Sequence, residues 1–179
     1  MRKAFPLLML LSISFAVKAQ TILKEVSLSA YIASPTLVDF DAYEKLMKTV
    51  KNHRKSHLVQ LASFVRMSTQ PGVIILDTRS DSMYNAKHIK GAIHLNFSDF
   101  TSDNLRKVIP SYATTILIYC NNNFANDQVY FATKGVSPRG ARSAGLTLAL
   151  NIPTYINLFG YGYENVYELS QTVSVNHPL

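Results

Sequence analysis

The sequence predicts an α/β domain built around a mainly parallel sheet. Two continuous apolar runs of strand length, 73–76 and 116–119, show no polar alternation, which is typical of central parallel strands covered on both faces. Helix-like segments lie between the strand candidates, and such alternation favours a parallel sheet. The chain has 179 residues, 47% of them apolar and 16% charged. This composition suits one compact domain and excludes a disordered chain.

The expected elements follow one another in a regular order. Asp39 can cap a first helix, whose apolar face consists of Phe40, Tyr43, Leu46, Met47 and Val50. A second, short helix ends before Pro71-Gly72 and contains the apolar residues Leu61, Phe64, Val65 and Met67. The remaining helical segments are 81–87, 102–108 and 141–150, and the shorter strand candidates are 93–95 and 166–169.

The first 19 residues have the layout of a secretory signal peptide. Arg2 and Lys3 form a charged start, an apolar stretch covers 5–15, and small Ala19 precedes the expected cut before Gln20. The apolar stretch is shorter than a membrane span. We therefore expect an exported protein, periplasmic or secreted, with no stable membrane span after cleavage.

This interpretation divides the chain into a signal peptide, 1–19, a partly helical N-terminal extension, 20–57, and a folded domain, 58–179. Cleavage takes the basic residues from 18 to 15 against 11 acidic residues, so the net charge falls from +7 to +4. A mild positive balance spread along the chain gives little support for a nucleic-acid partner. It is compatible with a small anionic substrate.

Polar residues follow both central strand candidates, where ligand sites of parallel sheets lie. The first strand leads into Asp77-Thr78-Arg79, and the second into Cys120 and three asparagines. A buried cysteine is often an inert small hydrophobic residue. The asparagines, however, tolerate unusual backbone conformations and can turn N–H groups toward an anion, which would stabilise a thiolate. Cys120 is therefore a candidate nucleophile.

Other Cys and metal chemistries have weaker support. A lone Cys excludes an internal disulfide framework and a multi-Cys zinc site. A phosphatase of the C-x5-R type would need an arginine where Asn126 stands. His53 and His57 lie four residues apart without a third ligand in a motif. We predict no metal and no cofactor.

Several blocks of sequence carry a family resemblance. Asp77-Thr78-Arg79, Tyr84 and HIKGAIHL at 88–95 resemble the D-x-R…Y…GHIxGAxxL signature of rhodanese-like domains. ILIYC at 116–120 resembles the strand that enters the rhodanese active-site loop, and GYGYENVYEL at 160–169 resembles the segment leading into the last strand. The chain is also similar to an exported bacterial subgroup with a YCNNNF loop and an LNIPTxINLxGYGY segment.

The resemblance implies a rhodanese-like fold: a central, mainly parallel five-stranded sheet with helices on both faces, preceded here by a helical extension. It also implies a sulfurtransferase. The Cys120 thiolate would take sulfur from a small anionic donor such as thiosulfate and hold it as a persulfide. A nucleophilic acceptor, a thiol or a protein, would then remove the sulfur.

The same resemblance assigns the site residues. The substrate would be bound by backbone N–H groups of the loop, contributed by Asn121, Asn122, Asn123 and Phe124. Structural support would come from Asp77, Arg79 and His88.

The loop departs from the family pattern Cys-x-x-Gly-x-Arg-Ser. Asn123 stands in place of the glycine, and the Arg-Ser ending appears later, at Arg142, after an insert of about 15 residues. If the insert loops out, Arg142 binds the anionic donor. Alternatively, the insert forms a lid carrying Lys134 or Arg139, or the loop is remodelled and excludes thiosulfate. A competing interpretation is a catalytically weak or inactive module that binds a protein or an anion.

Overall fold

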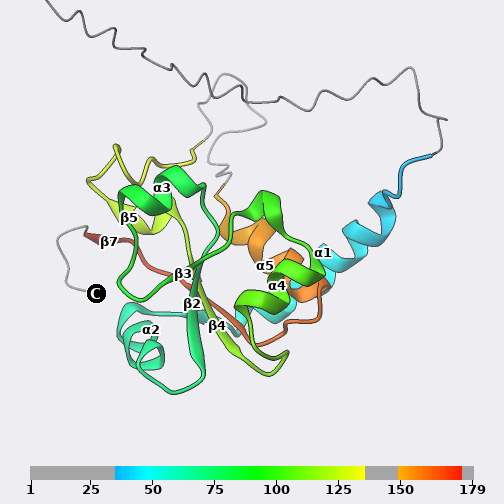
Figure 1. The fold of residues 1–179 in the computed structure, drawn as a ribbon, viewed down its shortest axis with the longest axis horizontal. Coiled ribbons are helices and arrows are strands. Elements are labelled where there is room, and N and C mark those ends of the chain that lie inside the picture. The colour runs from blue at the N-terminus through cyan, green and yellow to red at the C-terminus, as the bar shows by residue number, and fades with distance from the viewer. Residues whose placement is uncertain (1–34, 136–148, 175–179) are drawn as a thin grey trace, which may run out of the picture. The chain divides into compact units, whose positions relative to one another are not determined.

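Five strands form one sheet in the computed structural model, which describes residues 35–135 and 149–174. They are β1 (Leu58–Val59), β2 (Val73–Asp77), β3 (Ile93–His94), β4 (Thr115–Tyr119) and β6 (Val166–Leu169). The order across the sheet is β1-β6-β4-β2-β3, and every neighbouring pair is parallel. The predicted five-stranded parallel sheet is therefore confirmed, with β4 at its centre (Figure 1).

Helices cover both faces of this sheet, as predicted (Figure 1). One face packs against α1 (Phe40–Lys55), α4 (Ser102–Val108) and α5 (Asn151–Gly160), and the other against α2 (Leu61–Ser68) and the segment after α3 (Asp81–Ala86). Short 3-10 turns occur at η2 (Phe97–Asp99) and η3 (Asn121–Asn123), and β5 (Phe124–Ala125) pairs with β7 (Val173–Ser174). None of the helices described is both long and apolar enough to cross a membrane.

Strand β4 is buried on both faces, which explains why its sequence lacks polar alternation. Ile116 and Ile118 point into the core beneath α1, α4 and α5, whereas Leu117 and Tyr119 point into the core on the α2 side. All four side chains are buried. A strand covered on both faces needs apolar residues at every position.

The N-terminal helix α1 is confirmed and belongs to the compact unit that begins at Asp39. The Asp39 carboxylate accepts the Ala42 N–H at 2.9 Å, which caps the first turn. Val50 is buried against the core. A Cβ on Gly160 would lie 2.9 Å from Leu46 Cδ2, so α1 and α5 approach closely where α5 ends.

Helix α5 differs from the expected helix 141–150, most of which lies outside the described residues. Proline usually interrupts a helix, yet Pro153 occupies the third position of α5. Backbone N–H groups in the first helical turn have no intrahelical acceptor, so proline is tolerated there.

A buried ion pair holds the carboxyl end of the sheet together. Asp77 ends β2 with no exposed surface, and the Arg79 side chain is 2% exposed. Arg79 Nη2 lies 2.7 Å from Asp77 Oδ2, and the Tyr119 hydroxyl donates a hydrogen bond to the same oxygen. Burial, and then the Asp77 charge, raise the pKa of Tyr119. Its hydroxyl therefore remains protonated and acts as the donor.

The remaining guanidinium N–H groups of Arg79 bind three other segments. Nη2 donates to the Lys87 carbonyl at 2.6 Å, and Nη1 donates to the Tyr130 carbonyl at 3.2 Å and to Asn121 Oδ1 at 3.3 Å. The guanidinium carbon also lies 4.5 Å from the centre of the Phe131 ring. One buried cation thus links β2, the turn after α3 and the segments that follow β4.

Arg79→Met should lower the free energy of unfolding by about 3–5 kcal/mol, because it leaves the Asp77 carboxylate buried without a counter-charge. Urea denaturation monitored by circular dichroism measures this loss. Arg106→Met is the matched control, since Arg106 pairs with Asp103 on the exposed side of α4 and should cost less than about 1 kcal/mol. Equal losses in the two variants would contradict the role assigned to Arg79.

Candidate active site

Cys120 lies directly after the central strand β4, at the carboxyl edge of the sheet. The neighbours of β4 in the sheet are β6 and β2, and β2 ends at Asp77, two residues before Arg79. The residue is 2% exposed. The polar segments that follow two neighbouring parallel strands therefore meet at one edge, as expected for ligand sites in such sheets.

The three asparagines after Cys120 form the tight 3-10 turn η3. The Asn122 N–H is directed at Cys120 Sγ, with N···S 3.4 Å. Asn123 Oδ1 accepts the Cys120 N–H at 2.9 Å, and the Asn123 N–H donates back to the Cys120 carbonyl at 3.1 Å. These reciprocal bonds hold the loop backbone rigidly around the thiol.

Helix α5 begins on the other side of the thiol. Burial raises the pKa of Cys120, and the backbone N–H groups of Asn122, Asn151 and Leu150 act in the opposite direction by hydrogen bonding to the sulfur. The negative charge of Glu168 raises the pKa further. Because burial dominates, Cys120 is mainly a protonated thiol at neutral pH.

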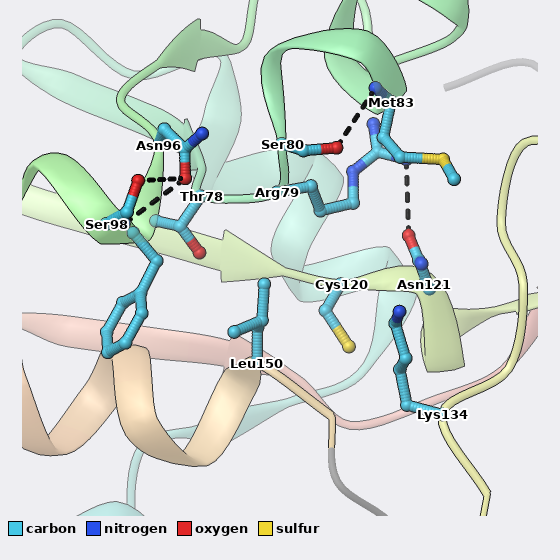
Figure 2. A pocket seen from close by; sticks show the side chains of 11 residues that line it. Thr78, Arg79, Ser80, Met83, Asn96, Ser98, Cys120, Asn121, Lys134 and Leu150 are labelled. Atoms are coloured by element: carbon cyan, nitrogen blue, oxygen red, sulfur yellow. Dashed lines mark hydrogen bonds between the residues drawn. The ribbon is translucent and has the colours of Figure 1, made fainter. Parts of the chain in front are cut away.

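A cavity of about 340 Å³ opens beside Cys120. Figure 2 shows the thiol between Leu150 and Lys134, with the amino end of Lys134 directed toward Asn121. The volume falls in the range of small-molecule sites. The cavity has apolar and hydroxyl-bearing walls together with two cations, and the described lining consists of Thr78, Arg79, Ser80, Met83, Asn96, Phe97, Ser98, Cys120, Asn121, Lys134 and Leu150.

A second cavity of about 220 Å³ lies against the same loop. Asn122 and Asn123 line it together with Asn151, Glu168 and Arg54. Its walls therefore combine residues of the Cys120 loop, α5, β6 and α1.

The loop residues predicted to bind substrate have different surroundings. Asn121 lines the cavity beside Cys120, whereas Asn122 and Asn123 line the second cavity. Phe124 is buried in the core on the α2 side, with its ring 4.1 Å from that of Phe131. Its N–H donates to the Asn121 carbonyl. Arg142 lies outside the described residues.

The residues predicted to support the site are distributed over two places. Asp77 and Arg79 form the buried pair at the sheet edge, and Arg79 also lines the cavity. His88 is exposed and stacks on the Tyr84 ring, with ring centres 3.9 Å apart. Its Nδ1 lies 2.7 Å from the Tyr84 carbonyl oxygen.

The insert is described as far as residue 135. Phe131 is buried, and the Lys134 N–H donates to Asn122 Oδ1 at 2.8 Å, which joins this part of the insert to the loop. Pro138, Arg139 and Arg142 lie outside the described residues. The three alternatives for the insert therefore remain open.

Sequence reasoning missed part of the cavity wall. Asn96, Phe97 and Ser98 follow β3, so the strand-end rule applied to β2 and β4 also points to them. Met83 and Leu150 carry no comparable signal. Across residues 35–135 and 149–174, the structure shows no group of three or more His, Cys, Asp or Glu side chains that could hold a metal ion.

Comparison with known proteins gives three findings. An uncharacterized protein of Buchnera aphidicola subsp. Schizaphis graminum (strain Sg) is 24% identical over 109 residues, which cover 55% of this chain and 74% of the relative. The crystal structure of the BH2092 protein from Bacillus halodurans is similar with a TM-score of 0.41 and 20% identity, over 74% of this chain and 75% of that one. The family model of the rhodanese-like domain matches residues 60–172. Since this match covers more than half of the sequence, the chain belongs to the rhodanese-like domain family.

Proposed function

We propose that this protein is a sulfurtransferase that carries sulfane sulfur on Cys120. The observation that carries the proposal is the placement of this thiol. It directly follows the central strand, accepts the Asn122 N–H at 3.4 Å and adjoins a cavity of about 340 Å³. Membership in the rhodanese-like family supports the same chemistry.

The reaction consists of two nucleophilic displacements. The Cys120 thiolate attacks the outer sulfur of a donor such as thiosulfate. A new S–S bond forms, the S–S bond of the donor breaks, and sulfite leaves with the electron pair. A nucleophilic acceptor then attacks the outer sulfur of the persulfide, and Cys120 leaves as a thiolate. The cycle needs no external oxidant or reductant.

The surroundings of Cys120 supply groups for both steps. The Asn122 N–H is directed at the sulfur, and backbone N–H groups at the start of α5 also lower the pKa of the thiol. Such groups stabilise negative charge that develops on the sulfur. Lys134 lines the cavity and favours an anionic donor, whereas the charge of Arg79 is balanced by Asp77. We also propose that Arg142 contributes to donor binding, in line with the Arg-Ser ending of the family loop.

A second candidate is a module that binds a protein or an anion without transferring sulfur. The burial of the thiol favours it, because a Cys with a raised pKa is a weak nucleophile at neutral pH. The two candidates differ in whether Cys120 accepts sulfur.

We further propose that the protein is exported. The charged start, the apolar stretch 5–15 and Ala19 support cleavage before Gln20, and the YCNNNF loop at 119–124 supports the exported bacterial subgroup. The donor would be a small sulfur anion, and the acceptor a thiol or a protein. Mass spectrometry of the protein from its native cells tests the proposal; a chain that retains residues 1–19 would contradict it.

Incubation with thiosulfate should add one sulfur atom to the protein, and a thiol or cyanide should remove it. Intact-mass spectrometry of the protein without residues 1–19 measures the addition. Cys120→Ser is the control and should gain nothing, because it lacks the nucleophile. No gain by the unaltered protein from thiosulfate or from an organic persulfide would overturn the sulfurtransferase proposal and favour the binding module.

Sulfur uptake should accelerate as the pH rises. Burial raises the pKa of Cys120 above its ordinary value, so the thiolate is a minor form at neutral pH and grows about tenfold for each pH unit below the pKa. Rates of persulfide formation between pH 6 and 8 measure this dependence. A rate independent of pH would show that the thiolate is already fully formed, and would contradict the effect assigned to burial.

A further inference from the structure

Glu168 is a buried acidic residue in β6 with a partner from outside the segment that matches the family. Its side chain is 6% exposed. Arg54, in the last turn of α1, donates two hydrogen bonds to it: Nε to Oε2 at 2.5 Å and Nη2 to Oε1 at 2.6 Å. Such a two-pronged contact is strong and orients both side chains. The family match begins at residue 60, so the N-terminal helix supplies the counter-charge of a core carboxylate.

Hydrogen bonds continue from Glu168 to the Cys120 loop. Asn151, the first residue of α5, donates through Nδ2 to Glu168 Oε1 at 3.0 Å and to Asn123 Oδ1 at 3.2 Å. The same Asn123 oxygen accepts the Cys120 N–H at 2.9 Å. A chain of three side chains therefore connects the guanidinium of α1 with the backbone of Cys120.

The orientation of each amide in this chain is determined by its partners. Asn123 Nδ2 donates to the carbonyls of Leu169 and Gln171, at 2.7 and 3.1 Å, which leaves Oδ1 for the Cys120 N–H. Asn151 must present its NH₂ group to two oxygens. One of these oxygens belongs to Glu168, which Arg54 holds in place.

The charge of Glu168 also acts on the thiol, whose pKa it raises. The charged groups around Cys120 within the described residues are Glu168 behind the loop and Arg79 and Lys134 along the cavity. Arg79 is already paired with Asp77. Beside Glu168, the Tyr155 hydroxyl of α5 is neutral, because burial and then the Glu168 charge raise its pKa. Arg54 is thus the cation that directly offsets Glu168.

We propose that Arg54 is a positioning residue for Cys120: helix α1 sets the reactivity of the thiol by holding Glu168 and, through Asn151 and Asn123, the loop. The proposal rests on the proposed function only in treating Cys120 as the reacting group. A helix that only packed against the core would not affect the reactivity of Cys120.

The test is the pH dependence of Cys120 alkylation by iodoacetamide, a small uncharged reagent that reports on the only cysteine of the chain. Arg54→Met leaves the Glu168 charge without its counter-charge. The pH at which alkylation reaches half of its maximal rate, the midpoint, should therefore rise by about half a unit, which corresponds to about threefold slower alkylation at neutral pH. Glu168→Gln removes the negative charge and should move the midpoint downward. Arg54→Lys keeps the charge and should restore the midpoint of the unaltered protein.

Shifts in opposite directions support the proposal, because a general loosening of the fold would move both variants the same way. Shifts in the same direction, or no shift, overturn it. Arg66→Ala, an exposed arginine bonded to Ser63 in α2, is the control and should leave the midpoint unchanged. Melting temperatures show that each variant is folded, and Arg54→Gln replaces Arg54→Met if the latter is not. Alkylation needs no sulfur donor, so its result is independent of whether thiosulfate is a substrate.

Discussion

Arg79 keeps its charge inside the protein because Asp77 provides a carboxylate two residues away. One ion pair does not use all five guanidinium N–H groups, and a buried donor left without an acceptor is costly. The chain satisfies them with the carbonyls of Lys87 and Tyr130 and with the Asn121 side chain. The demand for acceptors therefore brings together segments far apart in sequence, and the Cys120 loop is one of them. A buried pair adds little stability compared with apolar residues of the same size, but the loss of one partner is costly.

The core of the fold could be predicted because its signals are local. The apolar runs of β2 and β4 reflect burial on both faces, and Asp39 marks the start of α1 by its capping bond. Helix α5 could not be predicted in the same way. Pro153 lies in its first turn, where the missing N–H costs nothing, and a position within a helix cannot be read from proline alone. Strands β1, β5 and β7 have two residues each, too few for a periodic pattern.

The candidate site, too, could be predicted from the sequence only in part. Cys120 could be found because ligand sites lie at the carboxyl ends of parallel strands. The hydrogen bonds that link its loop to Arg54, through Asn151 and Glu168, could not, because they join positions up to 114 residues apart. In the sequence, Glu168 is a charged residue within the short strand candidate 166–169. It is buried because α1 covers that part of the sheet and supplies a matching guanidinium, a tertiary feature that no local pattern contains.

The position of β1 has a consequence for any shortened form of this protein. Leu58 and Val59 pair with β6 just before the segment that matches the family. A chain trimmed to residues 60–172 would lose this outer strand and leave the N–H and C=O groups of β6 open along one side. Open strand edges recruit other chains and promote aggregation. Poor solubility of such a fragment would then reflect the missing cover strand in addition to the loss of α1 from the core.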